Sequence, residues 1–142
     1  MKKLFAAVLV AASLVGCASV PMGDAKQDAA LKTFTVAPDK AGIYVYRNET
    51  MGAALKMDVS LDGALIGQTA ANTYLYKEVA PGKHSIVSQG ADKLDVDAAP
   101  GTLTFIWQEV KMGMLSGGSK LHLVDAAQGK KGVAETSLAV TK

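Results

Sequence analysis

The pattern of apolar and polar residues after residue 40 predicts a series of short β-strands. Between Leu55 and Leu61 apolar residues alternate with polar ones, and this period of two is typical of a strand with one buried face. The run 43–46 is instead β-branched and aromatic on both faces, which predicts a central strand. Further strands are predicted over residues 73–79, 84–89, 93–98, 102–110, 120–125 and 136–140.

Turn signals separate these strands about every 8–12 residues, which is the spacing of a β-sandwich or barrel. The Asp62-Gly63 pair lies between two apolar runs and predicts a two-residue type I′ hairpin, because both central residues of that turn need positive φ. The resulting register pairs Leu61 with Ala64 and Val59 with Ile66 on the inward face. We therefore expect an all-β fold, a small antiparallel β-sandwich.

Three stretches outside the strands have less regular patterns. Residues 24–33 are rich in helix-forming residues and begin with Asp24, a good N-cap, so a short helix and a partly ordered linker both stay open. Residues 18–23 contain a proline and a glycine and are expected to form a short tether. Residues 126–134 are polar and rich in glycine, and we interpret them as a turn or a single helical turn.

Residues 111–119 combine three glycines with apolar side chains and predict a flexible loop. Methionine on a flexible segment suits an adaptable binding surface. One hypothesis is that Met112, Met114 and Leu115 contact a partner protein or the lipid surface. The other is that these side chains fold back and cap one end of the sandwich.

The first residues have the features of a cleavable export signal. Lys2 and Lys3 precede the apolar run 4–12, which is too short to cross a bilayer, since a spanning helix needs about 20 apolar residues. The tetrapeptide Leu-Val-Gly16-Cys17 follows and resembles the lipobox of bacterial prolipoproteins. That resemblance implies cleavage between Gly16 and Cys17, and a diacylglyceryl group on the Cys17 thiol. An ordinary secreted protein with a chance cysteine at this position is the alternative.

The cysteine content of the sequence also agrees with a lipid anchor at Cys17. It is the only cysteine of the sequence, so no intramolecular disulfide forms, and lipid attachment explains an odd cysteine in an exported protein. Two or more acyl chains anchor a protein stably, whereas one chain does not. Ala18 follows the cysteine where an aspartate would favour the inner membrane. The sorting rule of such lipoproteins therefore indicates the outer membrane, with the domain facing the periplasm.

The chain beyond the signal, residues 1–16, is long enough for one domain with its own core. We expect a lipidated tether with a helix or linker over residues 17–37 and the β-sandwich over residues 38–142. Without Lys2 and Lys3 the basic residues fall from 15 to 13, which equals the 13 acidic residues. A formal charge of zero disfavours a nucleic-acid partner, because binding to phosphates needs a basic surface.

Several strand and turn segments resemble a bacterial lipoprotein family called domain of unknown function 2846. The resemblance covers residues 38–125 and lies in the segments Ala41–Arg47, Val59–Gly67, Tyr74–Tyr76 and Ala80–Ile86. The middle part is also similar to PEGA-type repeats, in which a strand, an Asp-Gly turn and a Pro-Gly-x-His turn build a small sandwich. The resemblance implies a prealbumin-like β-sandwich, and it implies no activity.

Candidate catalytic and metal-binding residues are few. The sequence has no G-x-S-x-G motif, and its two histidines lie far apart along the chain. His84 follows a Pro-Gly-Lys turn, where it resembles a structural residue of PEGA-type repeats, and His122 is expected to face solvent. Asp92, Asp95 and Asp97 form either a weak cation patch or, as their alternation favours, a solvated sheet face. We expect no catalytic residue, no metal ion and no cofactor.

Five aromatic residues, Tyr44, Tyr46, Tyr74, Tyr76 and Trp107, either line a ligand groove or pack across paired strands. The first case predicts a small-ligand carrier or an enzyme that uses a tyrosine-lined face. The second case, which the pattern favours, predicts a non-catalytic lipoprotein that acts in binding or assembly with an envelope protein. Small size and anchoring also fit an immunity or inhibitor lipoprotein.

Overall fold

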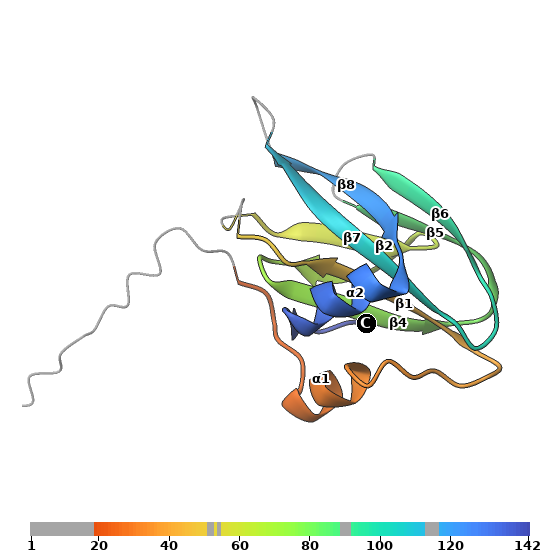
Figure 1. The fold of residues 1–142 in the computed structure, drawn as a ribbon. Coiled ribbons are helices and arrows are strands. Elements are labelled where there is room, and N and C mark those ends of the chain that lie inside the picture. Colours follow the sequence, from red (N-terminus) through yellow and green to blue (C-terminus); the bar gives the residue numbers. More distant parts are fainter. Residues whose placement is uncertain (1–18, 51–52, 54, 89–91, 113–116) are drawn as a thin grey trace, which may run out of the picture.

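The structure, a computed structural model, describes residues 19–50, 53, 55–88, 92–112 and 117–142. In this part of the chain two β-sheets lie face to face, and two short helices cover the outside of one of them (Figure 1). The strands are β1 (Ala41–Arg47), β2 (Met57–Leu61), β3 (Ala64–Thr69), β4 (Thr73–Val79), β5 (Gly82–Ser88), β6 (Lys93–Ala98), β7 (Leu103–Met112), β8 (Gly117–Val124) and β9 (Ser137–Leu138). The helices are α1 (Ala25–Leu31) and α2 (Ala126–Ala134). The predicted all-β sandwich is confirmed.

The five-stranded sheet has the order β8-β7-β1-β4-β9, and the four-stranded sheet has the order β3-β2-β5-β6. Apolar residues of both sheets meet between them, among them Val45 and Ile106 from one sheet and Val59 and Ile86 from the other. β1 is buried along its whole length, which confirms the predicted central strand. Most neighbouring strands are antiparallel as predicted, but β1 pairs with β7, and β4 with β9, in parallel.

The Asp62-Gly63 turn joins β2 to β3 as predicted. The two residues have φ of 50° and 85°, so both lie in the left-handed region that a type I′ turn requires. Leu61 pairs with Ala64 across the turn, which confirms the first predicted pair of the hairpin.

The second predicted pair of this hairpin, Val59 with Ile66, is wrong. A β-bulge sets Val59 opposite Gly67, so β3 holds one residue more than β2 over this stretch. Without the bulge Gln68 would point between the sheets. With it, the Gln68 amide lies on the outer side and donates a hydrogen bond there, while Thr69 is fully buried. The apolar pattern does not reveal the bulge, because Ile66 is an inward residue in either register.

Residues 126–134 form a helix, α2, and not the predicted turn or single helical turn. Asp125 caps this helix, since its carboxylate accepts a hydrogen bond of 2.8 Å from the backbone N–H of Gln128. Gly129 and Gly132 lie one helical turn apart on the face toward the five-stranded sheet. In the sequence these glycines indicate a broken helix, but in the fold they let the helix lie close against the sheet.

The predicted loop over residues 111–119 is too long at both ends, because strands occupy its first and last residues. β7 extends into this stretch from one side and β8 from the other, with Lys111 opposite Gly118. Residues 113–116 lie outside the described residues.

Of the two alternatives for residues 24–33, a helix and a partly ordered linker, the structure has the helix, α1. The Asp24 carboxylate caps it by accepting a hydrogen bond of 2.9 Å from the backbone N–H of Lys26. α1 lies beside the five-stranded sheet, on the same outer face as α2 (Figure 1). Among the described residues, no helix has the length and apolar character needed to cross a membrane.

Residues 19–23, which we expected in the tether, lie against the sandwich. The Gly23 N–H donates to the Leu138 carbonyl at 2.8 Å, and the Val140 N–H donates to the Pro21 carbonyl at 2.9 Å. Val20 is buried in the core between the sheets, with 7% of its surface exposed. The fold therefore includes the chain from three residues after Cys17.

Candidate functional site

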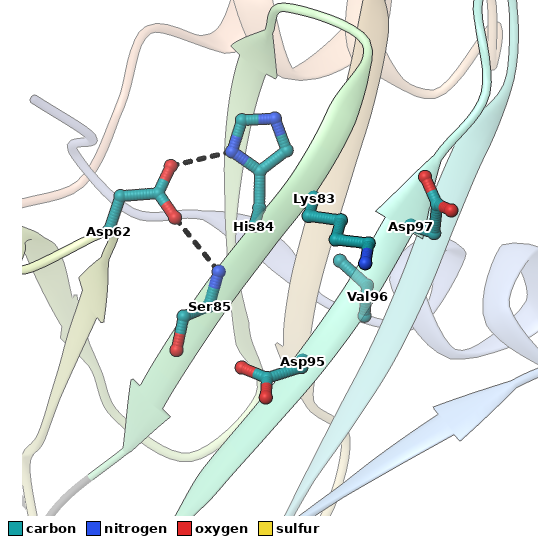
Figure 2. A pocket seen from close by; sticks show the side chains of 7 residues that line it. All are labelled: Asp62, Lys83, His84, Ser85, Asp95, Val96 and Asp97. Carbon is teal, nitrogen blue, oxygen red and sulfur yellow. Dashed lines mark hydrogen bonds and ion pairs between the residues drawn. The ribbon is translucent and has the colours of Figure 1, made fainter.

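A shallow hollow of about 490 Å³ lies where the Asp62-Gly63 turn meets the start of β5. It combines one residue of that turn with three from β5 and three from β6 (Figure 2). The lining residues are Asp62, Lys83, His84, Ser85, Asp95, Val96 and Asp97. The hollow therefore contains one of the two histidines and two of the three aspartates that the sequence singled out.

His84 holds two turns of the fold together at this hollow. Its Nδ1 atom lies 2.5 Å from Asp62 Oδ2 and its Nε2 atom lies 2.6 Å from the carbonyl oxygen of Ala80. The other carboxylate oxygen of Asp62 accepts a hydrogen bond of 2.8 Å from the Ser85 backbone N–H (Figure 2). The Asp62–His84 clamp, meaning these two side chains with the Ala80 carbonyl, thus connects the β2–β3 turn to the β4–β5 turn.

The geometry of the Asp62–His84 clamp favours the charged form of the imidazole. A carbonyl oxygen and an ionised carboxylate are both acceptors, so both ring nitrogens must carry a proton to make the two hydrogen bonds. The hydrogen bond to Asp62, and next the one to Ala80, raise the pKa of His84 above its ordinary value. The hydrogen bonds from His84 and Ser85 hold the pKa of Asp62 below its ordinary value. The sequence contains both turns but does not show that they meet.

The same geometry limits what this hollow can do chemically. A general base needs a free nitrogen lone pair near the proton that it removes, and both His84 nitrogens are occupied by protein acceptors. Ser85 contacts Asp62 through its backbone N–H, and its hydroxyl makes no hydrogen bond to the imidazole. The arrangement is that of a structural clamp, as the Pro-Gly-Lys-His turn suggested, and it does not form a catalytic triad.

The Asp62–His84 clamp predicts a pH-dependent stability. Because the folded pKa of His84 is raised, its contribution is complete below the ordinary histidine pKa and is lost as the pH rises through the raised value. The lowered pKa of Asp62 gives a contribution that is present above the ordinary aspartate pKa and is lost as the pH falls through the lowered value. We expect His84→Gln to lower the free energy of unfolding at pH 5.5 by about 1 kcal/mol, a small value because Asp62 is half exposed.

Urea unfolding at pH 5.5 and at pH 8.5 measures this effect, with Ser85→Ala as the matched control, because Ser85 joins the clamp through its backbone N–H. The difference between the native chain and His84→Gln should shrink at the higher pH, whereas Ser85→Ala should keep the pH dependence of the native chain. An equal destabilisation by His84→Gln at both pH values would contradict a charged imidazole in the clamp.

The three aspartates of the predicted cation patch do not come together. Asp95 and Asp97 lie on the outer side of β6, where both are exposed, in keeping with a solvated sheet face. Asp92 instead accepts a hydrogen bond of 2.5 Å from the Leu121 backbone N–H on β8. Within the described ranges, no group of three or more histidine, cysteine, aspartate or glutamate side chains is placed to hold a metal ion.

The tyrosines pack on the outer face of the five-stranded sheet. Tyr44 lies opposite Tyr76 and Tyr46 opposite Tyr74 across the β1–β4 pair, and the Tyr44 and Tyr76 rings are 4.7 Å apart. Tyr44, Tyr46 and Tyr74 are each at most 1% exposed. The rings therefore pack across paired strands, and α1 and α2 cover them.

Two tyrosine hydroxyls hold α1 in place. The Tyr44 hydroxyl donates to the Leu31 carbonyl at 2.5 Å, and the Tyr74 hydroxyl donates to an Asp28 carboxylate oxygen at 2.6 Å. Burial, with the neighbouring Asp28 for Tyr74, raises the pKa of both hydroxyls well above the ordinary value. These groups are neutral donors to the chain's own helix, which is a contact that the sequence did not reveal.

Trp107 and His122 form a second aromatic feature on the same sheet. Their rings stack with centroids 4.9 Å apart, so His122 is partly covered and does not face solvent freely as expected. Its Nε2 atom lies 2.9 Å from Glu109 Oε1, which also pairs with Lys111 Nζ at 3.0 Å. Tyr46 and Trp107 border a hollow of about 230 Å³ beside α2.

Other residues of interest lie beyond what the structure describes. Gly16 and Cys17, at the predicted cleavage and lipid attachment site, are outside the described residues, and so are Met114 and Leu115. Met112 ends β7 opposite Gly117. The proposed partner contact of these three residues thus stays a prediction.

The fold defines this protein as a small β-sandwich whose five-stranded sheet has an outer face covered by two helices. His84 joins its β2–β3 turn to its β4–β5 turn. The chain belongs to the family described as "Protein of unknown function (DUF2846)", whose model matches residues 37–119. An uncharacterized protein of Haemophilus influenzae is 34% identical over 99% of this chain and 88% of its own length. No solved structure matches.

Proposed function

We propose that this chain is a lipid-anchored protein of the bacterial envelope, whose β-sandwich acts without catalysis in binding or assembly at the membrane. The observation that carries the proposal is the N-terminal sequence. Lys2 and Lys3, the apolar run 4–12 and the tetrapeptide ending in Cys17 stand in the order of a lipoprotein signal. Two or more acyl chains, at about 0.8 kcal/mol per buried methylene group, give a stable anchor.

The proposed location is the outer membrane, with the domain facing the periplasm, because Ala18 follows the cysteine. The similarity to a bacterial protein fits this signal, because the lipobox belongs to bacterial prolipoproteins. The contact between the Asp-Gly turn and the Pro-Gly-Lys-His turn supports the PEGA-like relationship.

A non-catalytic role is supported by how the reactive groups are used. Both nitrogens of His84 bond to acceptors of the fold, and the hydroxyls of Tyr44 and Tyr74 bond to α1. The surface left for contacts consists of the outer face of the four-stranded sheet, with the edge strands β3, β6 and β8. These are features of an interaction module, and an envelope protein is the partner class that we propose.

Replacing Cys17 with serine tests the anchor. We expect the variant to incorporate no palmitate and to accumulate as a precursor that retains residues 1–16, because serine cannot form the thioether that precedes cleavage. Metabolic labelling with a palmitate analogue and membrane fractionation provide the measurement. Labelling of Cys17→Ser at the native level would refute the proposed anchor.

A second variant controls for the mere presence of a thiol. Ala64→Cys places an exposed cysteine at the start of β3, directly after the Asp62-Gly63 turn, and in the Cys17→Ser background it should restore neither labelling nor processing. Labelling of that double variant would show that acylation is not specific to the tetrapeptide ending in Cys17.

A further inference from the structure

The segment that follows Cys17 lies at one end of the sandwich. Ser19, Val20 and Met22 border a hollow together with the β3–β4 turn, residues 70–72, and with Ser137. The start of β4 at Thr73 pairs with Arg47, the last residue of β1, so this is the end where β1 stops. The Asp62–His84 clamp lies at the opposite end, beside the turn that follows β4. Figure 1 shows the N-terminal segment joining the fold away from the β4–β5 turn.

Covalent geometry limits how far this end can lie from a lipid on Cys17. Val20 is three steps along the chain from Cys17, and an extended chain spans at most about 3.3–3.6 Å per residue, which gives about 10 Å. Val20 cannot leave its place without exposing a core side chain, because it is 93% buried between the sheets. A lipid on Cys17 therefore brings this end of the domain to the membrane surface.

The surface at this end suits contact with lipid headgroups. Residues 19–23, 70–73 and 137–141 carry no charged side chain, although 20% of the residues of the chain are charged. Two carboxylates lie near these segments, and both accept hydrogen bonds within the fold: Glu49 from the Val110 backbone N–H and Glu135 from Asn48. Met22 and Val140 are 49% and 46% exposed. Met22 pairs with Ala139 in the C-terminal segment, and Val140, whose N–H donates to the Pro21 carbonyl, lies beside Gly67, between this end and the middle of β3. Uncharged surface with exposed apolar side chains enters the interfacial region of a bilayer at little desolvation cost.

We propose that this end of the sandwich, with Met22 and Val140 at its surface, rests on the lipid bilayer that holds the Cys17 anchor. The domain then lies on the membrane in one orientation, with the Asp62–His84 clamp at the end directed away from it. This inference rests on the proposed lipid anchor and adds the contact surface and the orientation. It makes the clamp end and the β6 edge the surfaces that are free to meet an envelope protein.

Site-specific quenching tests the orientation. The full chain, lipidated in bacteria, is purified with Met22→Cys, Val140→Cys or Ala64→Cys, labelled with bimane, and reconstituted into phosphatidylethanolamine–phosphatidylglycerol vesicles. The sulfur of Cys17 is then a thioether and takes no label. Nitroxide lipids should quench the label at positions 22 and 140 several-fold more than at position 64, which lies exposed on the clamp end.

The possible outcomes separate this inference from the proposed anchor. If the protein floats with the vesicles but positions 22 and 140 are quenched no more than position 64, the orientation is wrong and the anchor stands. If it lacks palmitate and does not float, the anchor itself fails. Shielding of positions 22 and 140 only in native membranes would mean that a protein covers this end, which overturns the lipid contact.

A spacer variant tests the role of the short connection. Ten glycine and serine residues inserted after Ala18 lengthen the reach of the chain without changing the anchor. We expect quenching at position 22 to fall toward the value at position 64 while flotation is unchanged. Undiminished quenching would overturn the claim that the short spacing holds this end at the membrane.

Discussion

Replacing Gly129 with alanine is expected to lower the free energy of unfolding by about 2–3 kcal/mol. A Cβ atom on Gly129 would lie 2.2 Å from both Cβ and Cγ of Phe105. Phe105 Cβ is fixed to β7 beside the central strand, so no rotamer change relieves the contact and α2 must lift from the sheet. In an isolated helix the same change would stabilise by about 1 kcal/mol, so the expected sign is reversed by packing.

Urea denaturation measures this change, and Gly118→Ala is the matched control. Gly118 lies in β8, and a Cβ atom there would meet nothing within 4 Å, so its replacement should shift stability by no more than about 0.5 kcal/mol. Gly132→Ala provides a second site, because its Cβ would lie 2.2 Å from the buried ring of Tyr46. A stabilising effect of Gly129→Ala would mean that α2 does not lie where the structure places it.

Local patterns predicted the strands well because each strand carries its own alternation of buried and exposed residues. In β6 the exposed residues Lys93, Asp95 and Asp97 alternate with more deeply buried neighbours, and this pattern is visible from the sequence alone. The parallel pairs β1–β7 and β4–β9 were not predictable in that way, since their partners lie far apart along the chain. No local pattern specifies which distant strand becomes a neighbour.

The helix α2 and the N-terminal segment show where residue type misleads. Gly129 and Gly132 favour a turn by propensity, yet close packing on Phe105 and Tyr46 requires them in a helix. Residues 20–23 have no periodicity, so the pairing of Pro21, Met22 and Gly23 with the C-terminal segment has no sequence signal. Tertiary contacts override the local preference in both cases.

The candidate site was predictable in its parts but not in its assembly. The Asp62-Gly63 turn and the turn before His84 are each evident in the sequence, and their resemblance to PEGA-type repeats suggested a structural histidine. The contact between them depends on β2 and β5 being neighbours, with Leu61 opposite Ile86. That pairing also decides that both His84 nitrogens face acceptors of the fold, so neither has a free lone pair in this arrangement.

A buried polar network between the sheets is another feature that alternation alone did not predict. Gln108 is fully buried on β7, on the face that it shares with Ile106. Its side-chain oxygen accepts a hydrogen bond of 2.5 Å from the Thr69 hydroxyl, and its amide donates one of 2.6 Å to the Ser88 hydroxyl. Ser88 also bonds to Ser119 on β8. The network therefore joins β3 and β5 of one sheet to β7 and β8 of the other.

Replacing Gln108 with leucine should lower the free energy of unfolding by about 2–4 kcal/mol, because the Thr69 and Ser88 hydroxyls each lose a partner in a site closed to water. The companion change Thr69→Val removes one of the hydroxyls that has lost its partner, so the double variant should recover part of the loss in stability.

Gln68→Leu, on the outer side of β3, is the matched control and should change stability by less than about 0.5 kcal/mol. Equal losses for Gln108→Leu and Gln68→Leu in urea unfolding would contradict a buried network. A loss confined to Gln108, partly restored by Thr69→Val, would establish that polar contacts as well as apolar ones hold the two sheets in register.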